Sequence, residues 1–216
     1  MSLARPASGV SPRFLALLEL EGLGEKRVLD VGCGSGRLTL LLAESARHVV
    51  GLDRDARALR DARARAAAAG LANAEFHEVD VEREEYARFA PDIVTAHLCA
   101  SDAVIERAAR ALEHGGCLGM VAFHVDQWRE TGRVSRFAYD EGRMAASLRG
   151  ASLEPEAIEV ERDIRDFPSL EAALAAAVSF EDRWKADGRW YAYIDFLERG
   201  GRTLTRSHLL VRARKR

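Results

Sequence analysis

The stretch that decides the fold reads Val28-Leu29-Asp30-Val31-Gly32-Cys33-Gly34-Ser35-Gly36-Arg37. Residues 27–31 predict a short buried strand, and the apolar run after the glycines, residues 38–43, predicts a helix. Glycines between a strand and a helix permit a tight turn and let a ligand approach the backbone where any Cβ would clash. Because free N–H groups at the start of a helix favour an anionic group, the turn is predicted to bind a ligand. A tight turn without a ligand is the alternative.

The same alternation of strand and helix continues along the chain. Strands are predicted over residues 48–53, 75–80, 92–97 and 117–124, with helices over 55–69 and 101–113 between them. Strands that alternate with helices indicate a doubly wound α/β fold, a mostly parallel sheet with helices on both faces.

Outside this central part, predicted strands and helices alternate less regularly. A loose arm and a helix over 14–20 precede it, and a helix over 139–149, a strand over 157–164, a helical stretch from 170 and a final strand over 202–212 follow it. No linker is visible, so one domain is expected over residues 1–216: an N-terminal arm and helix (1–24), a ligand-binding core (25–124) and a substrate-side part (125–216).

Composition excludes several classes of protein. The chain has 216 residues, of which 48% are hydrophobic and 31% charged, and this suits one compact domain. No apolar run approaches the roughly 18 residues that span a bilayer, so no membrane partner is expected. The formal net charge of −2 argues against a dedicated nucleic-acid-binding protein, and the basic run 212–216 is interpreted as a solvated tail.

Cysteine usage and the N-terminus indicate the compartment. Cys33, Cys99 and Cys117 have no metal-ligand spacing and cannot all pair. Residues 1–10 lack the apolar centre of a secretory signal, so a cytoplasmic protein is expected. Basic residues that are nearly all arginine, together with abundant alanine, indicate a GC-rich bacterial gene.

Two familiar nucleotide loops fit the glycine-rich turn poorly. The dinucleotide fingerprint needs a third glycine where Arg37 stands, and the phosphate loop needs a Gly-Lys-Ser/Thr ending. The turn closely resembles the first motif of the class I S-adenosylmethionine-dependent methyltransferases. This resemblance implies a seven-stranded, mostly parallel sheet with an antiparallel last strand, S-adenosylmethionine as cofactor, and contacts to its methionine part from Asp30, Gly32, Cys33, Gly34 and Gly36.

Acidic residues follow the next two strands. Asp53 lies 17 residues beyond Gly36, and a carboxylate there can accept two hydrogen bonds from a ribose diol, in a methyltransferase or in a nicotinamide enzyme. Asp80 is predicted to end the third strand; the resemblance implies that it accepts from the adenine amino group and that the Val81 N–H contacts the ring. Arg54 is either a cation–π partner of the adenine or an exposed residue at the start of a helix.

Two histidines stand at predicted strand ends, where open α/β sheets bind ligands. His97 and His124 can each accept a substrate proton near neutral pH, and each can equally be a hydrogen-bonded structural residue. The resemblance also makes His97 a cofactor contact. No residue spacing supports a metal site. Neither an Asn/Asp-Pro-Pro-Tyr/Phe sequence nor a Pro-Cys pair occurs near residue 97, so adenine-amine and cytosine-type chemistry have no support, and Cys99 is interpreted as a structural thiol.

The acceptor is expected to be a small molecule, because the chain is compact, carries no added nucleic-acid domain and has an acidic pI of about 6.3. The aromatic residues between Phe180 and Phe196 form either a lid over an apolar substrate or the core of a helical insertion. Two other functions stay open: an NAD(P)-dependent oxidoreductase, although no Tyr-x-x-x-Lys sequence is present, and a non-catalytic S-adenosylmethionine-binding scaffold. The atom methylated and the oligomeric state have no signal in the sequence.

Overall fold

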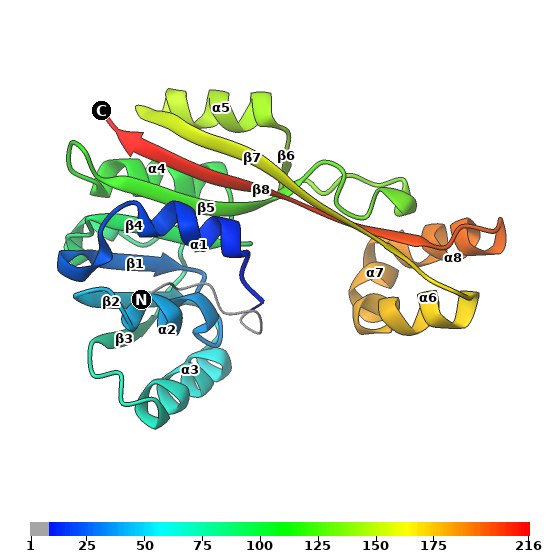
Figure 1. Ribbon diagram of the computed structural model, residues 1–216, viewed down its shortest axis with the longest axis horizontal. Coiled ribbons are helices and arrows are strands. Elements are labelled where there is room, and N and C mark those ends of the chain that lie inside the picture. Colours follow the sequence, from blue (N-terminus) through cyan, green and yellow to red (C-terminus); the bar gives the residue numbers. More distant parts are fainter. Residues whose placement is uncertain (1–8) are drawn as a thin grey trace. The chain divides into compact units, whose positions relative to one another are not determined.

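A computed structural model describes residues 9–216 (Figure 1). The strands are β1 Arg27–Val31, β2 His48–Asp53, β3 Ala74–Glu78, β4 Ile93–His97, β5 Cys117–His124, β6 Ala138–Tyr139, β7 Leu153–Asp166 and β8 Thr203–Lys215. The helices are α1 Pro12–Glu19, α2 Arg37–Ala43, α3 Ala56–Ala68, α4 Asp102–Ala111, α5 Glu141–Gly150, α6 Leu170–Ala177, α7 Glu181–Asp187 and α8 Arg189–Glu198. Short 3₁₀ turns are η1 Leu23–Glu25, η2 Tyr86–Phe89, η3 Arg129–Thr131 and η4 Val178–Phe180. Most of the predicted N-terminal arm lies outside the described residues.

The strands form one sheet in the order β3-β2-β1-β4-β5-β8-β7, with β6 paired to β5. Strands β1 to β6 pair in parallel. Lys215 near the end of β8 exchanges backbone hydrogen bonds with Gly115 and Gly116, just ahead of β5, so β8 runs antiparallel to β5. The predicted doubly wound, mostly parallel sheet with an antiparallel last strand is confirmed. The sequence missed β6, because two residues are too few to show a periodic pattern.

The chain divides into two compact units. Among the described residues, the first unit contains residues 9–122, 141–159 and 210–216, and the second contains residues 123–140 and 160–209. Strands β5, β7 and β8 each begin in one unit and end in the other. Each unit is therefore described by itself.

The first unit has an aliphatic core to which the N-terminal helix contributes strongly. Ser11 caps α1 by accepting the N–H of Phe14 at 3.2 Å, and Pro12 suits the first turn, where no N–H partner exists. The helix then buries Phe14, Leu15, Leu17 and Leu18 against residues of β1, β2, β4, β5 and α2. Burying four such side chains stabilises the unit by roughly 6–12 kcal/mol on transfer scales, before the entropy of ordering the chain opposes it.

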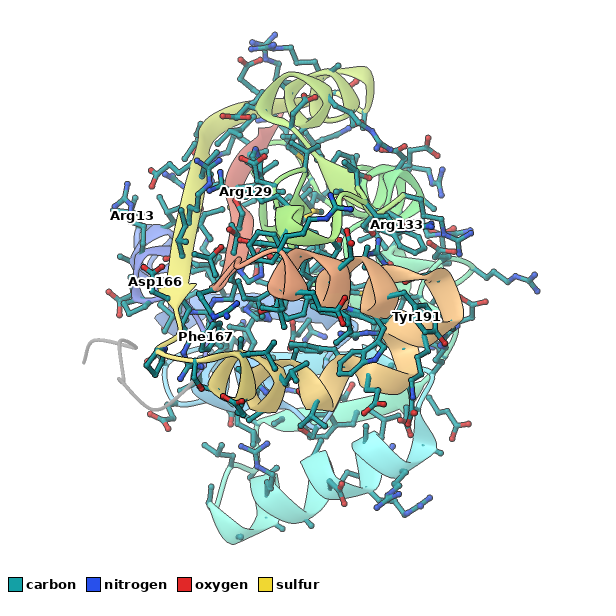
Figure 2. The ribbon with its side chains drawn as sticks, turned by 90° about the vertical axis from the view of Figure 1, so that its right-hand side faces the viewer. Arg13, Arg129, Arg133, Asp166, Phe167 and Tyr191 are labelled. Carbon is teal, nitrogen blue, oxygen red and sulfur yellow. The ribbon has the colours of Figure 1, made fainter. Side chains whose placement is uncertain are left out.

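Aromatic side chains form the core of the second unit. Trp184 and Tyr193 are both 0% exposed and pack with the partly buried Trp128, Phe180 and Phe196. Their rings make stacked and edge contacts; the Trp128 and Trp184 centroids, for example, lie 5.1 Å apart. Of the two interpretations of the aromatic segment, core packing therefore applies to Trp184 and Tyr193. In contrast, Tyr191 on α8, labelled in Figure 2, is 65% exposed.

One strand boundary differs from the prediction in a way that bears on the site. The third strand ends at Glu78, so Asp80 does not end it as predicted. The Asp80 carboxylate instead accepts the N–H of Glu82 at 3.1 Å, which starts a turn after the strand. No helix within residues 9–216 is long and apolar enough to span a membrane.

Candidate functional site: the glycine loop and the strand ends of the first unit

The glycine loop, residues 32–36, leaves β1 and enters α2 with positive φ at each of its three glycines. At Gly32 a Cβ would lie 2.4 Å from the Cys99 Sγ, so no other residue fits without movement of that side chain. At Gly34, where φ is 54°, a Cβ would have no atom within 4 Å, so this part of the loop faces open space. The loop therefore combines a packed base with an open backbone surface at Gly34.

Asp53, at the end of β2, is joined to this loop. Its Oδ2 accepts the Gly34 N–H at 2.7 Å, and its Oδ1 accepts the Asp55 N–H at 2.9 Å. A carboxylate has about four lone-pair positions, so it can accept further hydrogen bonds from a ligand. The side chain is only partly buried, and Arg54 beside it is exposed.

Asp30 lies inside the protein. Its side chain is 1% exposed, and its two oxygens accept from the Thr39 hydroxyl at 2.6 Å and from the Thr95 hydroxyl at 2.9 Å. Burial raises the pKa of Asp30 to about 6, although these hydrogen bonds and that from the Thr39 backbone oppose the shift. Asp30 can therefore act on a ligand only through the loop that follows it.

Cys33 and the residues after β3 have different surroundings. The Cys33 side chain is 8% exposed, and burial raises the pKa of its thiol well above the ordinary value, so it stays uncharged. The Asp80 side chain is half exposed and lies 3.5 Å from the Arg83 guanidinium. The Val81 carbonyl accepts from the Tyr86 hydroxyl at 2.7 Å, which fixes the backbone of this turn.

His97 ends β4 as an uncharged imidazole. Burial, with a smaller contribution from the positive charge of Arg37, lowers its pKa to about 4. Its ring centroid lies 6.3 Å from that of Phe14 on α1. The ring makes no hydrogen bond to residues 9–216, so its nitrogens are open to another partner.

The residue after His97 is strained. Leu98 has φ of 59°, in the left-handed region that leucine rarely adopts, and its N–H donates to the Val121 carbonyl at 2.8 Å. This turn presents Cys99 to Gly32. Sequence reasoning missed this strained turn, because a leucine after an apolar strand carries no signal of its backbone angle.

The structure brings together most of the predicted site residues of the first unit. The glycine loop, Asp53, the Asp80–Val81 turn and His97 follow the carboxyl ends of β1, β2, β3 and β4, which are neighbours in the parallel sheet (Figure 1). Open α/β sheets bind ligands at this edge. The order reverses between β1 and β4 beside the glycine loop, so the switch point of the sheet also lies there.

His124 belongs to the second unit and is 5% exposed. Its Nδ1 lies 3.0 Å from the Ser207 hydroxyl and accepts the Asp126 backbone N–H at 3.2 Å. Because a backbone N–H can only donate, the neutral ring carries its proton on Nε2. His124 is thus held by hydrogen bonds within its own unit.

Comparison with known proteins identifies the class that this fold and loop define. A family model described as "Methyltransferase domain" matches residues 24–170. The chain belongs to this family, among the class I S-adenosylmethionine-dependent methyltransferases, which confirms the resemblance seen in the glycine loop. The dinucleotide-dependent oxidoreductase is thereby set aside.

One solved structure shares the fold, and two curated relatives carry names with different substrates. The chain is similar to a putative methyltransferase, BH2331, from Bacillus halodurans C-125 (TM-score 0.69, 20% identity, 95% of this chain and 99% of that one). It is 34% identical over 121 residues to the ubiquinone biosynthesis O-methyltransferase of Paracidovorax citrulli (strain AAC00-1), covering 52% of this chain and 50% of that protein. It is 44% identical over 70 residues to the 23S rRNA (uracil(1939)-C(5))-methyltransferase RlmD of Stenotrophomonas maltophilia (strain K279a), covering 32% of this chain and 16% of that protein. The chain thus spans half or less of these two curated relatives.

Proposed function

We propose that the chain transfers the methyl group of S-adenosylmethionine to an oxygen, nitrogen or carbon of a small-molecule acceptor. The observation that carries the proposal is the joining of Asp53 to the Gly34 N–H at 2.7 Å beside an open part of the loop. The ubiquinone relative, matched over half its length, supports a small acceptor. The rRNA relative carries less weight in the choice of acceptor, because only 16% of that protein is covered.

The residues at the sheet edge fit this cofactor. The Gly34 backbone faces space that a Cβ would occupy, and the partly exposed Asp53 carboxylate keeps acceptor capacity for the two ribose hydroxyls. Asp80 would accept from the adenine amino group, Val81 would offer its N–H to the ring, and Arg54 would cover its face. The cofactor's methionine part would lie along Gly32, Cys33, Gly34 and Gly36. Asp30 would support this loop from the protein interior. When bound, the cofactor supplies a methyl group already activated by a positive sulfur.

The protein's own task is then alignment and proton handling. His97, uncharged at neutral pH, would contact the cofactor and accept a hydrogen bond, and then a proton, from the acceptor's nucleophile. Its low pKa suits an acceptor that loses its proton only as the methyl group arrives. His124 is the second candidate base; because the neutral ring carries its proton on Nε2, it would accept a substrate proton only at Nδ1, after releasing the Asp126 N–H.

We further propose that residues 1–216 act as one methyltransferase-like domain in which residues 125–216 form the substrate-side part. The chain would work in the cytoplasm of a bacterium. The bacterial relatives and the three unpaired cysteines support this setting.

The test is a methyl-transfer screen with cofactor carrying a radiolabelled methyl group, offered separately to phenolic and amine small molecules and to bacterial rRNA. Asp53→Ala should abolish transfer at low cofactor concentration. Asp61→Ala, which removes an exposed carboxylate of α3 outside the site, should not. Transfer to rRNA and to none of the small molecules would contradict the acceptor class, and cofactor binding without any transfer would favour the scaffold.

A further inference from the structure

Asp30, Thr39 and Thr95 form a buried hydrogen-bonded cluster, called here the clamp. The residues come from β1, α2 and β4, and none of the three is more than 1% exposed. Each oxygen of the Asp30 carboxylate accepts one threonine hydroxyl, at 2.6 Å from Thr39 and 2.9 Å from Thr95. The clamp thus ties three elements together at one carboxylate.

The positions of the two threonines are set by the fold. Asp30 and Thr95 are register partners in the neighbouring parallel strands β1 and β4. Thr39 is the third residue of α2, whose N-cap, Gly36, has no side chain to satisfy the first N–H groups of the helix. The Thr39 hydroxyl donates to the Asp30 carboxylate at 2.6 Å, so the preceding strand holds the first turn of this helix.

Both ends of the glycine loop are therefore anchored to the same carboxylate. The loop begins two residues after Asp30 and ends three residues before Thr39. A valine has almost the shape of a threonine and would fill both buried positions equally well. The hydroxyls therefore matter for the carboxylate, because an ionised group without hydrogen-bond donors is very unfavourable in the protein interior.

We propose that Thr39 and Thr95 are positioning residues for cofactor binding, whose hydroxyls hold the Asp30 carboxylate and thereby fix the glycine loop in its binding conformation. Neither threonine touches the cofactor in this proposal. The inference rests on the proposed function, since it assigns residues that support the same site.

The test compares isosteric and conservative substitutions at each position. Thr39→Val and Thr95→Val remove the hydroxyl, whereas Thr39→Ser and Thr95→Ser keep it. A matched control is Thr131→Val, which removes a buried hydroxyl that donates to the Trp128 carbonyl in the second unit. The readouts are the Kd for S-adenosylhomocysteine by calorimetry and thermal unfolding of the same samples.

The valine variants should bind S-adenosylhomocysteine about tenfold more weakly or worse, as expected when a hydrogen bond to a charged buried group is lost. The serine variants should stay within about threefold of the wild type, and the control should lose stability while keeping its Kd. Folded valine variants that bind as tightly as the wild type would overturn the inference. If a valine variant does not fold, alanine replaces it, and alanine binding as tightly as serine would overturn it too. A wild-type protein that does not bind S-adenosylhomocysteine would instead contradict the proposed function.

Discussion

The substitution Asp30→Asn should change the pH dependence of stability in a defined way. Burial raises the pKa of Asp30 from 3.8 to about 6. A shift of about two pKa units corresponds to about 3 kcal/mol between the two protonation states. For an acid whose pKa is higher in the folded state, the folded protein binds more protons than the unfolded chain between about pH 4 and pH 6. Stability is therefore highest below this window and is lost as the pH rises through it.

The asparagine variant lacks this titrating group, so it serves as the reference for the wild type. It keeps a side-chain oxygen that can accept from one threonine hydroxyl, although its amide nitrogen cannot accept from the other. The free energy of unfolding of the wild type, minus that of the variant, should fall by about 2–3 kcal/mol from about pH 4 to about pH 8. Roughly half of this fall should occur above about pH 5.

Urea unfolding followed by circular dichroism at several pH values measures this difference directly, because the other carboxylates titrate in both proteins and cancel. A difference that stays constant between about pH 5 and about pH 8 would refute the reasoning. It would mean that Asp30 is already ionised in the folded protein throughout the range. In that case the buried carboxylate would not have the environment described here.

Other substitutions test other parts of the structure. Trp184→Ala removes a fully buried ring, so it should lower the free energy of unfolding by about 3–5 kcal/mol in urea titrations, and a stable variant with altered acceptor use would contradict its place in the core. Gly32→Ala should abolish cofactor binding in calorimetry, because its Cβ would meet the Cys99 thiol at 2.4 Å. Gly34→Ala places its Cβ in open space and should destabilise the fold less. Equal stability of the two variants would contradict this packing. NMR titration should show His97 protonating at about pH 4, and Arg37→Gln should raise that pKa; an ordinary value in the wild type would contradict its burial.

Much of the sheet could be predicted from the sequence, because its strands are short apolar runs that end at polar or glycine residues. Strands β1, β2 and β5 begin and end at the predicted residues. The end of the third strand was predicted two residues too late, since alternation along residues 75–80 looks the same whether a carboxylate pairs in the sheet or caps a turn. Hydrogen bonding, and not hydrophobic pattern, ends that strand.

The candidate site could be predicted less completely. Gly34 and Asp53 were found because a glycine-rich turn and a strand-end carboxylate are local signals, and the structure joins them. Thr39 and Thr95 were missed, because a threonine in a buried helix or strand looks like any small core residue until the register with Asp30 is known. Whether the aromatic segment forms a lid or a core could not be predicted from the sequence, because packing decides it. Packing places Trp184 in a core.

The most direct test of the central claim is calorimetric titration of the folded wild-type chain with S-adenosylmethionine and, separately, with NADH, repeated with Asp53→Ala. Micromolar binding of S-adenosylmethionine alone, weakened at least tenfold by the substitution, is the predicted result. Absence of S-adenosylmethionine binding by the folded wild type, or binding that does not depend on Asp53, would contradict the site proposed at the glycine loop.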